Sequence, residues 1–285
     1  MKNLRSVLWD DETLASNVAT RDPDFGITHR AASRRLPFRL LRYWFIERLL
    51  REEAVHRGRR LRVLEVGVHR GQMKAFVDGA VPLEGHAPYL AWDAVDCALD
   101  EPKLRSLGYD QLHHANLDDP ASLAALEATL GEGRYDAVIA LHLLEHLREP
   151  ERVVAALSRS LAPGGAMLGG FPVLPDWLAP IRERQLRRTA RPFGHVSAFS
   201  PRRLERMARV SGFLPDYSAG AFALRASGSR LEDSAAWLRA NLLFGAVFPA
   251  WPGELYWRIR RLAPQGSMAP KSHAALRDFS HVNTA

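Results

Sequence analysis

An alternation of short apolar runs with helical patterns between residues 60 and 171 constrains the fold of this chain most. The apolar runs predict five strands, at residues 60–68, 89–95, 111–115, 135–141 and 166–171. Apolar residues at helical spacing predict helices between them, most clearly at residues 121–130 and 149–161. Strands that alternate with helices through short connections favour parallel pairing with right-handed crossovers, which is the doubly wound, Rossmann-like α/β architecture.

The segments on either side of this alternation predict further elements. Residues 1–60 form an N-terminal extension whose amphipathic helix is expected at residues 37–56, and the main domain is expected at residues 61–263. Ser200 is a suitable N-cap, and Pro201 a suitable first residue, for a helix that ends before Gly212. Two final strands are expected at residues 216–224 and 254–261, with an apolar, helical, lid-like insertion at 226–252 between them and a polar tail at 264–285.

Composition excludes several classes of protein. A hydrophobic content of 47% over 285 residues supports a sizeable core, and the single cysteine, Cys97, excludes an intrachain disulfide. The first residues carry acids where a signal peptide needs an apolar run, and we find no uncharged apolar run of about 18 residues, so we expect a cytoplasmic protein. The formal charge of +7 suits anionic partners, but the arginines are spread along the chain, which favours a general compositional effect.

The segment RVLEVGVHRG, residues 62–71, is the first candidate for ligand binding. The strand expected there passes into a helix through a turn bracketed by Gly67 and Gly71. Glycine permits a close approach of the backbone to a ligand, and the first N–H groups of a helix attract an anion. His69 occupies the place where a third glycine is usual, and the spacing does not fit the dinucleotide pattern G-x-G-x-x-G.

The segment YDAVIALHLLEHLREPERVVAALSRSLAPGGAML, residues 135–168, carries a more specific pattern. It resembles class I S-adenosylmethionine (SAM)-dependent methyltransferases, and most of all the small-molecule subgroup that includes the ubiquinone-pathway enzymes. The shared features are Asp136 at the start of a strand, Leu-Glu-His at residues 144–146, and Leu-x-Pro-Gly-Gly at residues 161–165. The histidine loop and helix at residues 194–213 are similar as well. The resemblance implies a seven-stranded, mostly parallel sheet with a reversed last strand.

The resemblance also implies a SAM site across the carboxyl ends of the first four strands. The residues expected there are Glu65, Gly67, Val68, His69, Gly71, Asp96, Asn116, Leu117, Leu141 and His142. A carboxylate can accept a hydrogen bond from each ribose hydroxyl. We prefer Asp96 for this role because Asp93 is expected inside the strand, and Asn116 is either an adenine contact or a turn residue.

Methyl transfer requires a positioned nucleophile and a group that takes its proton. Three histidines, His142, His146 and His195, are expected on loops or first turns near the cofactor and are candidate catalytic bases. Together with Glu145 they also form a candidate ligand set for a divalent metal. This set resembles the Glu-x-x-Glu-His motif of some ubiquinone-pathway and small-RNA 2′-O-methyltransferases, but we favour a metal-free site.

We therefore expect a SAM-dependent enzyme that methylates an oxygen, or less favourably a nitrogen or carbon, of a small molecule such as a metabolite or sugar. The arginines of residues 182–191 could hold an anionic substrate, and the apolar residues 242–251 could cap an apolar one or contact a membrane peripherally. A metal-dependent RNA-terminus 2′-O-methyltransferase is an alternative, although basic residues are not interleaved with stacking aromatics as nucleic-acid binding favours. A non-catalytic binding protein is a second alternative.

Overall fold

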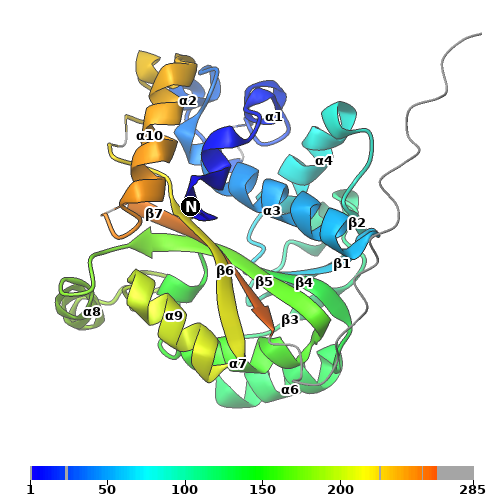
Figure 1. The fold of residues 1–285 in the computed structure, drawn as a ribbon. Helices are drawn as coiled ribbons and strands as arrows, with labels where there is room; N and C mark the ends of the chain where they lie inside the picture. Colours follow the sequence, from blue (N-terminus) through cyan, green and yellow to red (C-terminus); the bar gives the residue numbers. More distant parts are fainter. Residues whose placement is uncertain (1, 23–24, 225, 252, 262–285) are drawn as a thin grey trace, which may run out of the picture.

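The centre of the structure, a computed structural model, is a seven-stranded sheet of order β3-β2-β1-β4-β5-β7-β6 (Figure 1). The structure describes residues 2–22, 25–224, 226–251 and 253–261. The strands are β1 (Leu61–Val66), β2 (Tyr89–Asp96), β3 (Leu112–His114), β4 (Tyr135–Leu141), β5 (Leu161–Val173), β6 (Phe213–Gly220) and β7 (Gly253–Arg261).

The five strands that alternate with helices pair in parallel, and β7 is antiparallel to both of its neighbours, β5 and β6. The doubly wound, mostly parallel sheet with a reversed last strand is thus confirmed. The central strands β1 and β4 are almost continuously buried because helices cover both of their faces.

Helices cover the two faces of the sheet separately. Figure 1 shows α3, α4 and α10 on one face, and α6, α7 and α9 on the other. The helices are α1 (Glu12–Ser16), α2 (His29–Ala32), α3 (Leu41–Arg57), α4 (Gln72–Glu84), α5 (Glu101–Ser106), α6 (Pro120–Leu130), α7 (Pro150–Arg159), α8 (Ala179–Arg188), α9 (Pro201–Val210) and α10 (Ala235–Val247), with short 3₁₀ turns η1 (Lys2–Leu8), η3 (Phe38–Leu40), η4 (Leu144–His146) and η5 (Arg230–Asp233). Within the described residues, no helix is both long and apolar enough to cross a bilayer.

The N-terminal extension is part of the packed core. Phe45 of α3 stacks on Tyr256 of β7 with ring centroids 4.3 Å apart, and Trp44 is fully buried beside it. At the other end of α3, Arg59 donates two hydrogen bonds to the buried carboxylate of Asp136, which opens β4. The extension therefore covers one face of the sheet together with α4 and α10, and it reaches from β7 to the amino end of β4.

Two strands, β5 and β6, differ most from their expected bounds. Strand β5 begins at Leu161, before the Pro-Gly-Gly turn, since Tyr135 of β4 already pairs with Leu161 and the register then shifts. Strand β6 begins at Phe213, directly after Gly212 ends α9 with a positive φ of 77°, and ends at Gly220 instead of continuing to Leu224.

The end of β6 is set by the approach of α10. A Cβ on Gly245 of α10 would lie 2.1 Å from the carbonyl oxygen of Gly220, so the two backbones meet at a distance that only glycine permits. The expected helical insertion at 226–252 corresponds to η5 and α10, and α10 packs on η1 and β6. Its movement as a lid stays a prediction, and the polar tail expected at 264–285 lies outside the described residues.

Candidate functional site

The turn from β1 into α4 uses three left-handed residues. Gly67, His69 and Gly71 have φ values of 78°, 49° and 78°. A Cβ on Gly71 would lie 2.5 Å from Cδ1 of Leu107, so this position excludes larger residues sterically as well as conformationally. His69 therefore adopts the conformation of the glycine that was expected in its place, and the turn keeps its shape.

Asp96, at the carboxyl end of β2, holds this turn in place. Its Oδ2 accepts a hydrogen bond from the backbone N–H of His69 at 2.9 Å, and its Oδ1 accepts one from Ala98 at 3.1 Å. A carboxylate offers about four acceptor positions, so Asp96 can accept further hydrogen bonds at the carboxyl end of β2.

Asp93, the alternative residue for the ribose, is instead bonded to other parts of the sheet. It is buried and accepts hydrogen bonds from the Tyr135 hydroxyl at 2.7 Å and from the Gln111 backbone at 3.1 Å. These partners tie β2 to β4 and to the segment before β3. The geometry therefore favours Asp96 over Asp93 for contact with a ligand.

Glu65 lies near the end of β1 and is almost completely buried. Its Oε2 accepts hydrogen bonds from the Trp92 indole at 2.9 Å and from the Tyr109 hydroxyl at 2.6 Å. Burial raises the pKa of Glu65 to about 7, although the two hydrogen bonds and Lys74 oppose the shift. Glu65 consequently changes its charge near neutral pH.

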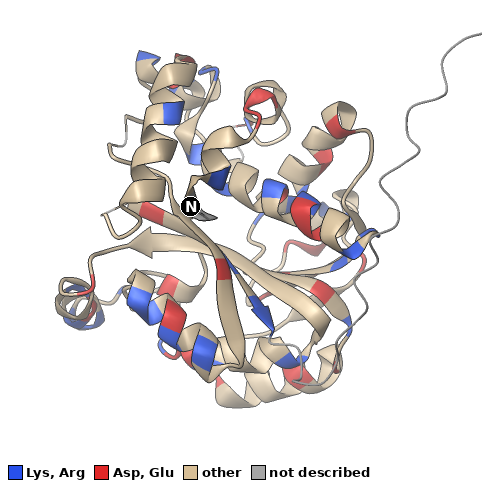
Figure 2. Ribbon diagram, viewed as in Figure 1, with Lys and Arg blue, Asp and Glu red and all other residues tan. Residues whose placement is uncertain are grey.

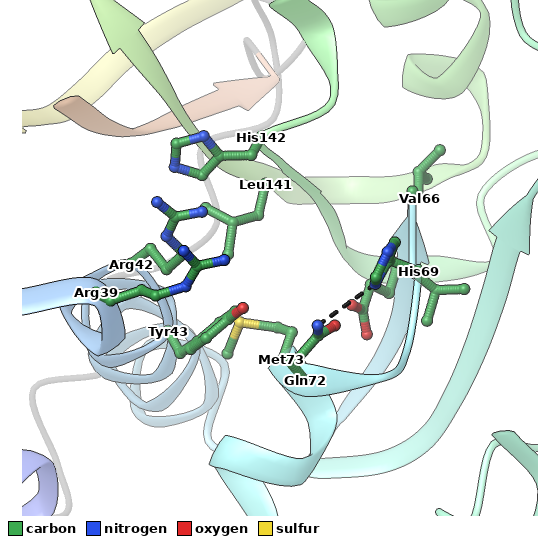
Figure 3. Close-up of a pocket in the computed structure, with 12 residues that line it drawn as sticks. Arg39, Arg42, Tyr43, Val66, His69, Gln72, Met73, Leu141 and His142 are labelled. Carbon is green, nitrogen blue, oxygen red and sulfur yellow. Dashed lines mark hydrogen bonds between the residues drawn. The ribbon is translucent and has the colours of Figure 1, made fainter. Parts of the chain in front are cut away.

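A cavity of about 240 Å³ opens beside the turn. Figure 3 shows Arg39, Arg42 and Tyr43 of the N-terminal extension on one side of it, and His69 and Gln72 on the other. Other residues from the expected cofactor site also line it: Glu65, Gly67, Val68, Leu141 and His142. The cavity thus places two guanidinium groups opposite the N-terminus of α4, where an anionic group is favoured.

The remaining two residues of the expected cofactor site follow β3. Asn116 is exposed, and its side-chain oxygen accepts a hydrogen bond from the Asp118 backbone at 3.1 Å, as in an Asx turn. Leu117 is buried in the core under α6 and α7. The side-chain oxygen of Asn116 is therefore part of a turn, as one of the two expectations held. The side-chain NH₂ group can still donate a hydrogen bond to a ligand.

His142 follows β4 and lies between two carboxylates. Its Nδ1 is 3.0 Å from Oε1 of Glu145, and its Nε2 is 3.5 Å from Oε2 of Glu254 on β7. Burial lowers the pKa of His142, but the two carboxylates outweigh burial and Arg42 and raise the pKa above the ordinary value. An imidazole in this position tends to keep its proton, which disfavours His142 as a base.

His146 and His195 lie on the other side of Glu145. Their rings meet edge to face with centroids 4.7 Å apart, and one potential ligand atom from each of Glu145, His146 and His195 lies within 4.8 Å of the others. His142 is not part of this group but contacts it through Glu145. Burial lowers the pKa of His195, and Glu145 opposes the shift, so the neutral form of this exposed ring is favoured.

A second hollow, of about 420 Å³, lies beside this group. Glu145 and His195 line it together with Arg182 and Leu186 of α8 and with Gly253 at the start of β7. It therefore combines an acid, a histidine, a cation and apolar surface. His142 and Glu145 lie between this hollow and the cavity beside the glycine turn.

Sequence reasoning missed Arg39, Arg42 and Glu254. Arg42 pairs with Glu254 at 2.9 Å, and Glu254 in turn faces His142. Glu254 is the one acid of β7, and it was a visible signal beside the apolar residues that follow it. Its partners come from α3 and from the loop after β4, and only the tertiary structure brings these segments together.

Comparisons with known proteins agree with the fold described above. A family model described as a methyltransferase domain matches residues 33–215. A SAM-dependent methyltransferase from Mesorhizobium loti has a similar structure with a TM-score of 0.50 and 17% identity, covering 77% of this chain and 98% of its own. The trans-methyltransferase CalH in complex with S-adenosylhomocysteine (SAH) is similar with a TM-score of 0.51 and 16% identity, over 78% of this chain and 58% of its own. No curated protein matches the sequence.

Proposed function

The chain belongs to the family of methyltransferase domains, and on that premise we propose that it transfers the methyl group of SAM to an oxygen of a small molecule, with nitrogen or carbon as less favoured acceptors. It is thus an enzyme with SAM as its cofactor rather than a non-catalytic binding protein. One observation supports the site above all others. The left-handed turn of Gly67, His69 and Gly71 is bonded to Asp96 and opens on a cavity at the carboxyl ends of the strands, where such sheets bind ligands.

We assign each part of SAM to residues at the carboxyl ends of the strands. The methionine part occupies the cavity beside Gly67 and Leu141, with its carboxylate facing the N-terminus of α4 and the guanidinium groups of Arg39 and Arg42. The ribose lies against Asp96, and the adenine extends towards Asn116 and Leu117. Bound SAM supplies an activated methyl group on a sulfonium leaving group.

The methyl acceptor is proposed to occupy the second hollow, between His195 and Arg182. As the acceptor oxygen bonds to the methyl carbon, the carbon–sulfur bond of SAM breaks, SAH leaves, and the acceptor proton passes to His195. Glu145 faces the imidazole and stabilises its protonated form. His142 is a positioning residue, since its two carboxylate contacts fix the loop between the cofactor and the acceptor. Arg182 accounts for the expected preference for an anionic acceptor.

Calorimetry with SAM and with SAH tests the cofactor site. We expect micromolar dissociation constants for the wild type, and at least tenfold weaker binding for Asp96→Ala. A folded wild-type protein that does not bind SAM would refute the proposal. SAH release with a panel of phenols, sugars, carboxylates and amines then tests the acceptor class, with His195→Gln expected to lose about 100-fold in turnover at unchanged SAM affinity.

A metal-assisted version of this reaction has one specific observation in its favour. Glu145 Oε2 is buried and, among the described residues, has no hydrogen-bond partner, while it lies in the group with His146 and His195. One carboxylate and two imidazoles suit a divalent ion, which would supply Lewis-acid activation of the acceptor oxygen. Activity that EDTA abolishes and a divalent ion restores would support this version, and with tight RNA binding it would favour the RNA-terminus alternative.

A further inference from the structure

Large apolar side chains are exposed on two segments of the surface. Trp177, in the turn before α8, and Ile181 in α8 are 71% and 60% exposed. At the end of α10, Phe248 and Trp251 are 56% and 51% exposed, and both rings contact Phe244, with centroid distances of 5.1 and 5.7 Å. Isolated exposed apolar residues are ordinary, whereas clusters of aromatic residues mark interaction surfaces.

These two segments adjoin the same end of the paired strands β5 and β7. Val173 at the end of β5 is in register with Gly253 at the start of β7. Trp177 follows this point by four residues, and Trp251 precedes it by two. Figure 1 shows α8 and the end of α10 beyond the same end of β5 and β7, and residues of α8 and the start of β7 line the second hollow together. The exposed apolar residues therefore flank this hollow.

Helix α8 adds positive charge to this edge. It carries four arginines, and Figure 2 shows blue segments on this helix. Its single acid, Glu183, is already paired with Arg187 and Arg203. Ile181, Arg184 and Arg188 are all exposed and follow one another at spacings of three and four residues, so they share one face of the helix. Tryptophan and aliphatic residues beside arginines are the composition of helices that lie in a membrane interface.

We propose that the edge formed by the turn before α8, α8 itself and the end of α10, here called the docking edge, binds the surface of an anionic lipid bilayer. The apolar side chains enter the headgroup region, and the arginines of α8 pair with lipid phosphates. The charge of α8 favours a bilayer over a purely apolar partner. The second hollow then opens beside the bilayer, and an acceptor that partitions into lipid reaches it directly; this consequence alone rests on the proposed function.

Flotation of the full-length protein with lipid vesicles tests the docking edge without cofactor or substrate. We expect binding to vesicles of phosphatidylglycerol and phosphatidylcholine, at least tenfold weaker binding to pure phosphatidylcholine, and weaker binding in 0.5 M salt. The double variants Trp177→Ser/Ile181→Ser and Phe248→Ser/Trp251→Ser are each expected to reduce the partition coefficient about tenfold. Arg184→Glu/Arg188→Glu is expected to remove the preference for the anionic lipid.

The matched control is Val55→Ser/Leu90→Ser, which removes two apolar residues that are 81% and 58% exposed on α3 and β2. This variant should bind vesicles like the wild type, and circular dichroism should show that all variants are folded. Absence of vesicle binding by the wild type would overturn the proposal, as would equal losses in the control. If the wild type bound no vesicles but formed dimers, and the apolar variants dissociated these dimers, the edge would instead be assigned to self-association. Because SAM binding is measured separately, failure here leaves the proposed function standing.

Discussion

Nδ1 of His142 lies 3.0 Å from Oε1 of Glu145, and this contact joins the loop after β4 to the group formed with His146 and His195. His142 also adopts a left-handed conformation with φ 52°. A non-glycine residue in that region costs about 1 kcal/mol or more, and such strain is concentrated at functional sites. Contacts to Glu145 and Glu254 on opposite sides of the ring offset this cost.

The substitution His142→Asn tests the energetic role of this ring. Asparagine tolerates the left-handed backbone but cannot bridge Glu145 and Glu254, so both buried carboxylates lose their contact with the ring, and among the described residues only Glu254 keeps a cationic partner, Arg42. We expect a loss of about 1–3 kcal/mol in the free energy of unfolding, measured by urea denaturation. His69→Asn is the control, since His69 is also left-handed but exposed, and it should change stability by less than about 0.5 kcal/mol.

Asp96 and Asp93 should separate ligand binding from stability. Asp96→Ala is expected to weaken SAM binding at least tenfold with a modest loss of stability. Asp93→Ala leaves the Tyr135 hydroxyl without its carboxylate partner and should cost about 2–4 kcal/mol in the free energy of unfolding. Calorimetry and urea denaturation of both variants measure the two effects, and the reverse pattern would assign the ribose to Asp93.

Glu65 predicts a pH dependence of stability. Its folded-state pKa of about 7 lies above the ordinary value of 4.5, so the folded protein binds the extra proton between these pH values. The resulting stabilisation is full below pH 4.5, declines as the pH rises, and is lost above about pH 7. Glu65→Gln keeps an acceptor for Trp92 and Tyr109 without a titrating group. The stability of the wild type relative to this variant should fall by up to about 3 kcal/mol from pH 4.5 to 8.

Gly71 and Gly58 form a matched pair for the backbone. Both have positive φ, but a Cβ on Gly58 meets nothing within 4 Å, whereas one on Gly71 would clash with Leu107. Gly58→Ala should therefore cost only the backbone strain of about 1 kcal/mol. Gly71→Ala should cost at least about 2 kcal/mol more in urea denaturation and should weaken SAM binding. Equal effects would mean that Leu107 moves aside freely.

Asp136 tests the attachment of the N-terminal extension. Its buried carboxylate accepts two hydrogen bonds from Arg59 and one from the Arg62 backbone, and it lies 2.9 Å from Arg57. Asp136→Ala should destabilise the protein by about 3–5 kcal/mol in urea denaturation. Asp176→Ala, which removes the partner of the exposed Arg202, should cost less than about 1 kcal/mol. A small effect of Asp136→Ala would show that core packing alone holds the extension.

Local pattern was sufficient to predict most of the architecture. The apolar runs at 89–95 and 135–141 became β2 and β4 with the expected starts, because a strand buried between two helical layers must be apolar along its length. Ser200 capped α9 as expected, since its side chain accepts a hydrogen bond from the Arg203 backbone. The early start of β5 and the early end of β6 were not predictable, since they depend on the register with β4 and on the contact of Gly220 with Gly245.

The sequence by itself determined the order of strands and helices, the glycine turn and the candidate residues along one sheet edge, because these follow from periodicity and from short-range backbone preferences. Only the tertiary structure decided how those residues work together. It placed His142 between Glu145 and Glu254, left His195 exposed beside Glu145, and brought Arg39 and Arg42 of the N-terminal extension to the cavity. The pKa of a side chain and the lining of a cavity depend on groups distant in the sequence, and their positions are set by how the whole chain packs.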